Sequence, residues 1–334
     1  MERILQRRLE MLAVAVLFTA WGGLGQVLDR RGYTDALYWP DYVVHEVAPG
    51  SVLDESGFQV GDRFQTVEGF PVETLGMYSR WPRALSRRPG ETLAVTVERD
   101  GRSVPLIVRY RETPESVEST RRVALVVVLS FLWLGMAVLF TSPTPHAFRF
   151  ALVGLAAGAT LAGPDLGVLN GVLGHVQVAA EVLWVILLLH FFLLFPTPKG
   201  VARSRWVGLL YAPWLVLVVC LALEVVTHPR LYHAFGAFIG ILLVGYLLTS
   251  VGVVIHTVAT TGWDHLTRTG MGIILVGWGV AVIPNAVAVV GWLIPPGLDT
   301  PGQAFFPYLL TAIPLTMALA VRTEASRDVA GAGG

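Results

Sequence analysis

Eight long apolar stretches constrain the fold of this chain more than any other feature of its sequence. They occupy residues 11–28, 123–140, 148–169, 174–195, 206–226, 234–256, 271–294 and 304–321. A helix needs about 20 apolar residues to cross the roughly 30 Å hydrocarbon core of a bilayer. With 54% hydrophobic and 14% charged residues, the 334-residue chain is too apolar for an ordinary soluble protein. We therefore predict eight transmembrane helices, of which the third could end early at Gly163-Pro164-Asp165.

Basic residues in the short connections predict the orientation of these helices. One face collects ten of them: Arg3, Arg7, Arg8, Arg149, Lys199, Arg203, Arg205, Arg268, Arg322 and Arg327. The other face has only Arg230, and the remaining 13 lie in the long polar segment after the first stretch, where charge has little influence on translocation. Because positive charge in short loops stays in the cytoplasm, both termini are expected there and the polar segment outside. No basic face typical of nucleic-acid binding is found.

The first apolar stretch is interpreted as a retained anchor and not as a cleaved signal peptide. It is long for a signal peptide, and no small-residue cleavage site precedes Leu28-Asp29. The predicted organisation is a cytoplasmic N-terminus and first helix (1–30), an extracytoplasmic domain with its linker (31–120), a seven-helix domain (121–322) and a short disordered cytoplasmic tail (323–334). Cys220 is the single cysteine, so no disulfide can form within the chain.

Turn and strand signals in the polar segment predict a small α+β domain. In chain order we expect a strand at 43–47, a short helix capped by Ser51 and ended by Gly57, a strand at 62–67, a helix at 74–85, and strands at 92–99 and 103–109. Asp100-Gly101 joins the last two strands and is a strong hairpin signal.

This segment resembles the bacterial type of PDZ domain. The matching positions are Val47, Pro49-Gly50-Ser51, Gly57-Phe58, Gly61-Asp62, Val67, Gly69 and Pro71-Val72. The resemblance implies that an extended peptide adds as a strand in a groove between an edge strand, formed by Tyr42, Val43 and Val44, and a helix that contributes Met77 and Trp81. Asp41 stands where the resemblance leads one to expect glycine, and its charge disfavours a peptide C-terminus. An internal peptide or a structural role is therefore equally expected.

Two apolar motifs carry a second resemblance, to the membrane region of bacterial polytopic sensor histidine kinases with an extracytoplasmic PDZ-like domain, the peptide-pheromone receptor type. They are 190–196, which reads HFFLLFP, and the pair Pro307-Tyr308-Leu309 and Ile313-Pro314-Leu315. After Val321 about a dozen residues remain, without a phosphoacceptor helix or an ATP-binding domain. The resemblance implies a multi-pass protein of the bacterial inner membrane that has no kinase domain of its own.

From these features we predict a membrane all-α bundle, one helix plus seven, with an inserted α+β PDZ-like domain. The predicted function is that of a non-enzymatic sensor or protein-interaction module; the alternative is a structural or accessory subunit of a larger membrane complex. Expected partners are a peptide or protein at the groove, the lipid bilayer, and a separate cytoplasmic or membrane signalling protein. PDZ modules also accompany membrane-embedded metalloproteases, but the only His-Glu pair, His45-Glu46, has no second histidine at helical spacing. We therefore predict neither enzyme activity, nor a metal, nor a cofactor.

Five polar residues inside the apolar stretches are candidate functional residues: Gln177, Glu181, His190, Glu224 and Asn285. One reading is a ligand pocket or protonation switch built on Glu181 with Glu224 or Asn285. The other is hydrogen bonding between helices, together with a kink at Pro284. Two glycine faces, Gly236-Gly240-Gly245 and Gly272-Gly277-Gly279, are expected to allow close helix approach.

Overall fold

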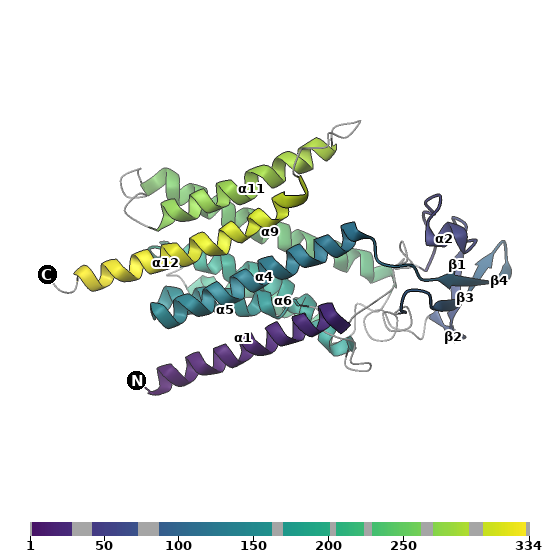
Figure 1. Ribbon diagram of the computed structural model, residues 1–334, viewed down its shortest axis with the longest axis horizontal. Helices are drawn as coiled ribbons and strands as arrows, with labels where there is room; N and C mark the ends of the chain where they lie inside the picture. Colours follow the sequence, from purple (N-terminus) through teal and green to yellow (C-terminus); the bar gives the residue numbers. More distant parts are fainter. Residues whose placement is uncertain are drawn as a thin grey trace.

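Helices lying side by side form a bundle, and a small β domain lies at one end of it (Figure 1). The computed structural model describes residues 2–28, 42–72, 87–161, 170–200, 205–223, 229–261, 270–293 and 303–331. Both chain termini lie at the end of the bundle opposite the β domain (Figure 1). The polar segment therefore leaves the bundle after its first helix and returns at the same end.

Each of the eight apolar stretches contains helix. The α-helices are α1 (Glu2–Leu28), α4 (Glu115–Thr141), α5 (Pro145–Gly158), α6 (Asn170–Leu194), α8 (Ala212–Ala222), α9 (Pro229–Thr261), α11 (Met271–Leu293) and α12 (Ala312–Gly331). Two 3₁₀ segments, η4 (Arg205–Tyr211) and η6 (Gln303–Thr311), precede α8 and α12. Among the described residues, four helical spans are long and apolar enough to cross a membrane: Ile4–Gly25, Glu118–Thr141, Val172–Leu194 and Ala237–Thr260.

These four spans indicate a membrane protein, but eight crossings are not confirmed. Helix α5 has 14 residues, or about 21 Å at 1.5 Å per residue, which is short of the roughly 30 Å of hydrocarbon. It ends at Gly158, before the predicted break at Gly163-Pro164-Asp165, which lies outside the described residues. Two further apolar helices, Val207–Ala222 and Met271–Asn285, are also shorter than a full span.

Aromatic side chains from α5, α6 and α11 form the centre of the bundle. The rings of Phe191 and Phe195 stack with centroids 5.1 Å apart, and Phe150 packs 6.1 Å from Phe191. Phe192 turns toward α11 and lies edge-on to Trp278 at 5.8 Å. The three phenylalanines of the HFFLLFP motif are fully buried, so in this structure the motif supplies core packing.

Two helix pairs approach closely because glycine faces the neighbouring helix. A Cβ atom added to Gly154 of α5 would lie 2.5 Å from the carbonyl oxygen of Phe131 in α4. Gly277 of α11 lies still closer to the side chain of Thr316 in α12, whereas a Cβ added to Gly279 would meet only Ile283 of its own helix, at 3.9 Å. The expectation for α9 is wrong at Gly240 and Gly245, where an added Cβ would meet nothing within 4 Å, and the surroundings of Gly236 lie outside the described residues.

The β domain is a four-stranded antiparallel sheet with a short helix. Its strands are β1 (Arg63–Val67), β2 (Phe70–Pro71), β3 (Thr92–Arg99) and β4 (Arg102–Arg109), in the spatial order β2-β1-β3-β4, and its helix is α2 (Val52–Glu55). The predicted hairpin is confirmed: β3 and β4 pair from Thr92 with Arg109 to Arg99 with Arg102, and Asp100 and Gly101 both have positive φ. One sheet face carries the buried residues Leu93, Val95, Val97 and Val108.

Local signals around α2 are confirmed, whereas the first predicted strand is not. Ser51 caps α2 by accepting a hydrogen bond from the Asp54 N–H at 3.1 Å, and Gly57 follows the helix with a φ of +81°. Residues 43–47 form only a single bridge, Val43 with Arg63. The partner segment turns just before β1, where the Asp62 N–H bonds the Gln59 carbonyl at 3.1 Å, so the pairing that starts at Tyr42 stops at Val44.

Candidate functional site

The predicted edge strand of the β domain lies antiparallel to the start of β1. Val44 donates its N–H to the Asp62 carbonyl and accepts from the Gly61 N–H, both at 2.8 Å, while the Tyr42 carbonyl accepts from the Phe64 N–H at 2.8 Å. Tyr42 and Val44 thus direct these backbone groups toward β1. Since neighbouring strand residues face opposite sides, the backbone N–H and C=O of Val43 point away from β1.

The side chains of the three predicted groove residues differ in exposure. Val44 is fully buried in the core of the β domain, next to Phe58 and Phe64, so it anchors the segment and cannot contact a peptide directly. Tyr42 and Val43 are half-buried. The other predicted wall of the groove, with Met77 and Trp81, lies outside the described residues.

An ion pair with an almost fully buried carboxylate and a partly exposed arginine fixes the loop that holds this segment. The carboxylate of Asp62, 1% exposed, accepts two hydrogen bonds from Arg99, at 2.8 and 2.7 Å, and one from the Gln59 N–H at 2.9 Å. Arg99 also donates to the Gly57 carbonyl at 2.8 Å. Burial by itself raises the pKa of Asp62, but the bonds from Arg99 and Gln59 and the charge of Arg99 together hold it below its usual value. Asp62 therefore stays ionised, and the loop that carries the partners of Val44 is rigidly placed.

A second contact ties the turn before α2 to the end of the sheet. Arg111, just after β4, donates to the Gly50 carbonyl at 3.2 Å and forms an ion pair with Glu55 of α2. Both ends of the segment that includes residues 42–50 are thus held against the β domain, one by the Asp62 loop and the other by Arg111.

The polar residues of the helices have separate neighbours. Gln177 donates to the Leu161 carbonyl after α5 at 2.9 Å, and the His190 Nδ1 lies 2.7 Å from the Tyr211 hydroxyl of η4. Asn285 donates to the Ala281 carbonyl, four residues back on its own helix, at 2.7 Å. Glu181 is on an exposed side of α6. Glu224 lies outside the described residues, so its suggested pairing with Glu181 has no structural counterpart here.

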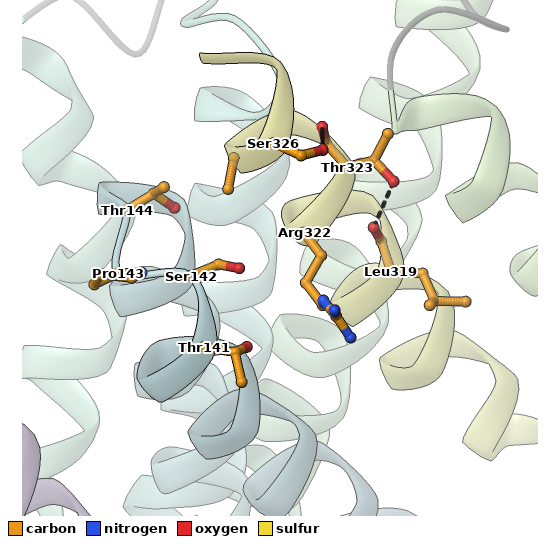
Figure 2. A pocket seen from close by; sticks show the side chains of 9 residues that line it. Thr141, Ser142, Pro143, Thr144, Leu319, Arg322, Thr323 and Ser326 are labelled. Atoms are coloured by element: carbon orange, nitrogen blue, oxygen red, sulfur yellow. Dashed lines mark hydrogen bonds between the residues drawn. The ribbon is translucent and has the colours of Figure 1, made fainter. Parts of the chain in front are cut away.

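Two pockets flank the corner between α4 and α5, at the end of the bundle where both termini lie. The larger, about 730 Å³, is lined by Thr141, Ser142, Pro143, Thr144, Leu319, Arg322, Thr323, Ala325 and Ser326. Figure 2 shows the hydroxyls of Ser142 and Thr144 on the α4–α5 side and Arg322 with Thr323 on the facing helix α12. The smaller pocket, about 350 Å³, lies on the other side of the corner against α1 and includes Arg7, Arg8 and Arg149.

Sequence reasoning used these arginines for orientation alone and did not predict either pocket. Residues 7, 149 and 322 are far apart in the sequence, and only the folding of α1, α5 and α12 around one corner brings them to the same end. The one sequence feature that pointed to these pockets is that the arginines were all predicted to lie on the same face of the membrane.

A metal centre is not assembled by the part of the chain that the structure describes. No group of three His, Cys, Asp or Glu side chains there could hold a metal ion. His45 and Glu46 are both exposed in the β domain, and His190 is engaged with Tyr211. The sequence contains no His-Glu-x-x-His motif.

Comparison with known proteins finds relatives of part of the chain. Proteins of Brucella suis and Brucella melitensis, each named a "putative zinc metalloprotease", are 41% identical over 80 residues, which cover 24% of this chain and 19% of theirs. A protein of Mesorhizobium japonicum with the same description is 32% identical over 106 residues, 31% of this chain and 28% of its own. The chain thus spans less than a third of the length of these curated relatives. No family model and no solved structure matches it.

These relatives overturn the predicted function. They are named as enzymes of the protease class, whereas the sequence led us to predict a non-enzymatic sensor or an accessory subunit. The prediction gave too much weight to the missing His-Glu-x-x-His motif and to apolar motifs such as HFFLLFP, which the structure uses for core packing.

Proposed function

We propose that this protein acts in proteolysis at a membrane, and that its β domain binds the polypeptide to be cleaved. The observation that carries the proposal is the 41% identity over 80 residues to proteins named as zinc metalloproteases. The polar segment between Leu28 and Glu115 has about that length, and we assign the shared stretch to it. The PDZ-like pattern of this segment supports the assignment, because PDZ modules that accompany membrane-embedded metalloproteases serve in substrate selection.

Strand addition is the binding mode that the PDZ-like pattern of the β domain favours. Residues 42–44 are fixed against β1 by three backbone hydrogen bonds and by the buried side chain of Val44. In the PDZ-like pattern an extended peptide adds beside the segment that corresponds to residues 42–44. The rigid Asp62–Arg99 loop pre-organises this edge, so little ordering is required on binding.

Zinc does not fit the described residues, although the names of the relatives imply it. The sequence offers no His-Glu-x-x-His motif, and the described residues offer no cluster of three ligands. We therefore derive no hydrolytic step through a metal. The role assigned to this chain's own residues is the capture and alignment of a substrate.

In this proposal the β domain is outside the cytoplasm and both termini are inside. The opposite placement of the termini and the β domain along the bundle supports this arrangement, as does the basic end of the bundle with Arg7, Arg8, Arg149 and Arg322. Substrates would accordingly be membrane proteins or extracytoplasmic proteins with an extended segment close to the bilayer.

The test compares cleavage products in cells that contain the wild-type chain, no chain, Asp62→Ala or Arg122→Ala. New N-termini of membrane and extracytoplasmic proteins are quantified by mass spectrometry. We expect a set of products that disappears without the chain and falls about fivefold with Asp62→Ala, because this change removes the carboxylate that positions the loop bonded to Val44. Arg122→Ala removes exposed ion pairs at the start of α4, outside the β domain, so it should stay within about twofold of wild type.

Two outcomes contradict different parts of the proposal. If the products are the same with and without the chain, a role in proteolysis is wrong. If they depend on the chain but not on Asp62→Ala, with equal amounts of each variant in the membrane, the protein acts in proteolysis but the edge at residues 42–44 is not the binding site.

A further inference from the structure

The smaller pocket at the terminal end of the bundle combines a cationic rim with an apolar wall. Arg7 and Arg8 reach it from α1, and Arg149 from α5. No acidic residue lines this pocket, and within the described part of the chain no ion pair joins these three arginines to a carboxylate. The nearest acidic residue along α1, Glu10, accepts a hydrogen bond from Gln6. The pocket therefore presents positive charge without an internal counterion.

The remaining wall is suited to hydrocarbon. Ile4, Leu139 and Phe148 line the same pocket, and Ile4 and Phe148 are 60% and 37% exposed. These exposed apolar side chains lie next to arginines, so the surface of the pocket has a positively charged part and an apolar part. A compact inorganic anion would use only the charged part, whereas an amphiphile would use both.

The depth of the pocket agrees with a lipid. Arg7 and Arg8 lie in the first two turns of the membrane-length span Ile4–Gly25, and the pocket abuts the end of the span Glu118–Thr141. The ends of such spans lie at the level of the lipid headgroups, where arginine guanidinium groups meet lipid phosphates. Basic pockets between transmembrane helices at this level are suited to anionic headgroups.

We propose that this pocket binds an anionic phospholipid, with the headgroup phosphate held by Arg7, Arg8 and Arg149 and an acyl chain lying along Ile4 and Phe148. The bound lipid bridges α1 to the α4–α5 corner. The direct contacts of α1 in this structure include a hydrogen bond from Trp133 of α4 to Thr19, at 3.0 Å, in the half of α1 farther from the pocket. A lipid in the pocket would add contacts between the N-terminal half of α1 and the α4–α5 corner.

The test is native mass spectrometry of the purified full-length chain in dodecyl maltoside, titrated with dioleoyl phosphatidylglycerol, dioleoyl phosphatidylcholine or inorganic phosphate. We expect phosphatidylglycerol to be retained at least about tenfold better than phosphatidylcholine, and inorganic phosphate not to displace it. Arg149→Gln should weaken retention about fivefold, since one basic residue near anionic lipid contributes about that factor. Arg149→Lys should stay within about twofold of wild type.

Arg322→Gln is the matched control, because Arg322 lies at the same end of the bundle but lines the larger pocket. It removes the same charge and should leave retention unchanged. Equal losses with Arg149→Gln and Arg322→Gln would overturn the proposal in favour of general surface charge. Displacement by inorganic phosphate would overturn the lipid assignment in favour of an anion site, and equal retention of both lipids would overturn it altogether.

A melting temperature for each variant, measured in the same detergent, separates a loss of binding from a loss of folding. If Arg149→Gln is unfolded, retention of phosphatidylglycerol by the double variant Arg7→Gln/Arg8→Gln tests the proposal instead.

Discussion

An ion pair and turn geometry position the loops of the β domain, whereas close packing of aromatic side chains and glycine positions the central helices of the bundle. In the β domain the buried Asp62–Arg99 pair determines where the loop before β1 lies, and Asp100 and Gly101 turn the hairpin at positive φ. In the bundle, stacked phenylalanines fill the space between helices, and Gly154 allows α4 and α5 to come into contact. The difference follows from the surroundings. Polar side chains of the β domain can be hydrated where they reach its surface. Helices in lipid gain little free energy from burying apolar side chains, and their association therefore depends on close packing.

The largest expected effect is the loss of the ion pair in the β domain. Asp62→Ala leaves the guanidinium of Arg99, 23% exposed, without its carboxylate and the Gln59 N–H without its acceptor, so the β domain should lose about 2–4 kcal/mol of stability. Pulse proteolysis of the full-length chain in urea, read on peptides of the β domain, measures this loss. Arg122→Ala removes two exposed ion pairs, with Glu115 and Glu118 at the start of α4, and should cost about 1 kcal/mol at most. Equal effects of the two variants would contradict the special position of Asp62.

A smaller loss is expected when the close contact in the bundle is broken. Gly154→Ala places a methyl group against the backbone of α4, which cannot move aside as a side chain could, and should cost about 1–3 kcal/mol. Unfolding of the purified protein by sodium dodecyl sulfate, followed by circular dichroism, gives the change. Gly240→Ala is the control, since it meets open space and should be neutral or stabilise the helix by up to about 1 kcal/mol. A destabilising Gly240→Ala would show that α9 is packed more tightly than the structure has it.

The smallest expected effect is the response of the β domain to acid. Burial raises the pKa of Asp62, but Arg99 and the Gln59 N–H lower it by more than burial raises it. In the folded state the pKa therefore lies below the usual value of 3.8. A depressed pKa contributes stability that is present above about pH 4 and is lost as the pH falls through the folded pKa. The stability difference between wild type and Asp62→Asn should therefore narrow between pH 5 and the acid limit of the folded protein, by pulse proteolysis in urea. A difference that stays constant over this range would refute the assignment.

Elements specified by a few adjacent residues could be predicted from the sequence. The cap at Ser51, the end of α2 at Gly57 and the hairpin at Asp100-Gly101 depend on local backbone geometry, and all three are confirmed. The strand predicted at 43–47 is not, because pairing needs a partner of equal length, and the partner segment turns at residues 59–62, opposite Val44. Likewise, the apolar stretch 148–169 reads as a full span, but α5 ends after 14 residues.

The candidate sites show the same division. Tyr42, Val43 and Val44 could be placed on one segment from sequence, yet the burial of Val44 and the outward direction of the Val43 backbone depend on how that segment meets β1. The two pockets at the α4–α5 corner could not be predicted, because the residues that line each of them come from distant helices. The protease relationship came from relatives and not from a motif within the chain.

The sequence by itself determined that the chain is apolar enough for a membrane, where helices form, and how the turns of the polar segment are made. These properties depend on composition and on contacts within a few residues. Only the tertiary structure decided which glycines bring helices together, which valine is buried, and that Arg7, Arg8 and Arg149 share one pocket. The reason is physical: close contacts and shared charge depend on distances between segments far apart in the chain, and periodicity along a single helix carries no information about its neighbour.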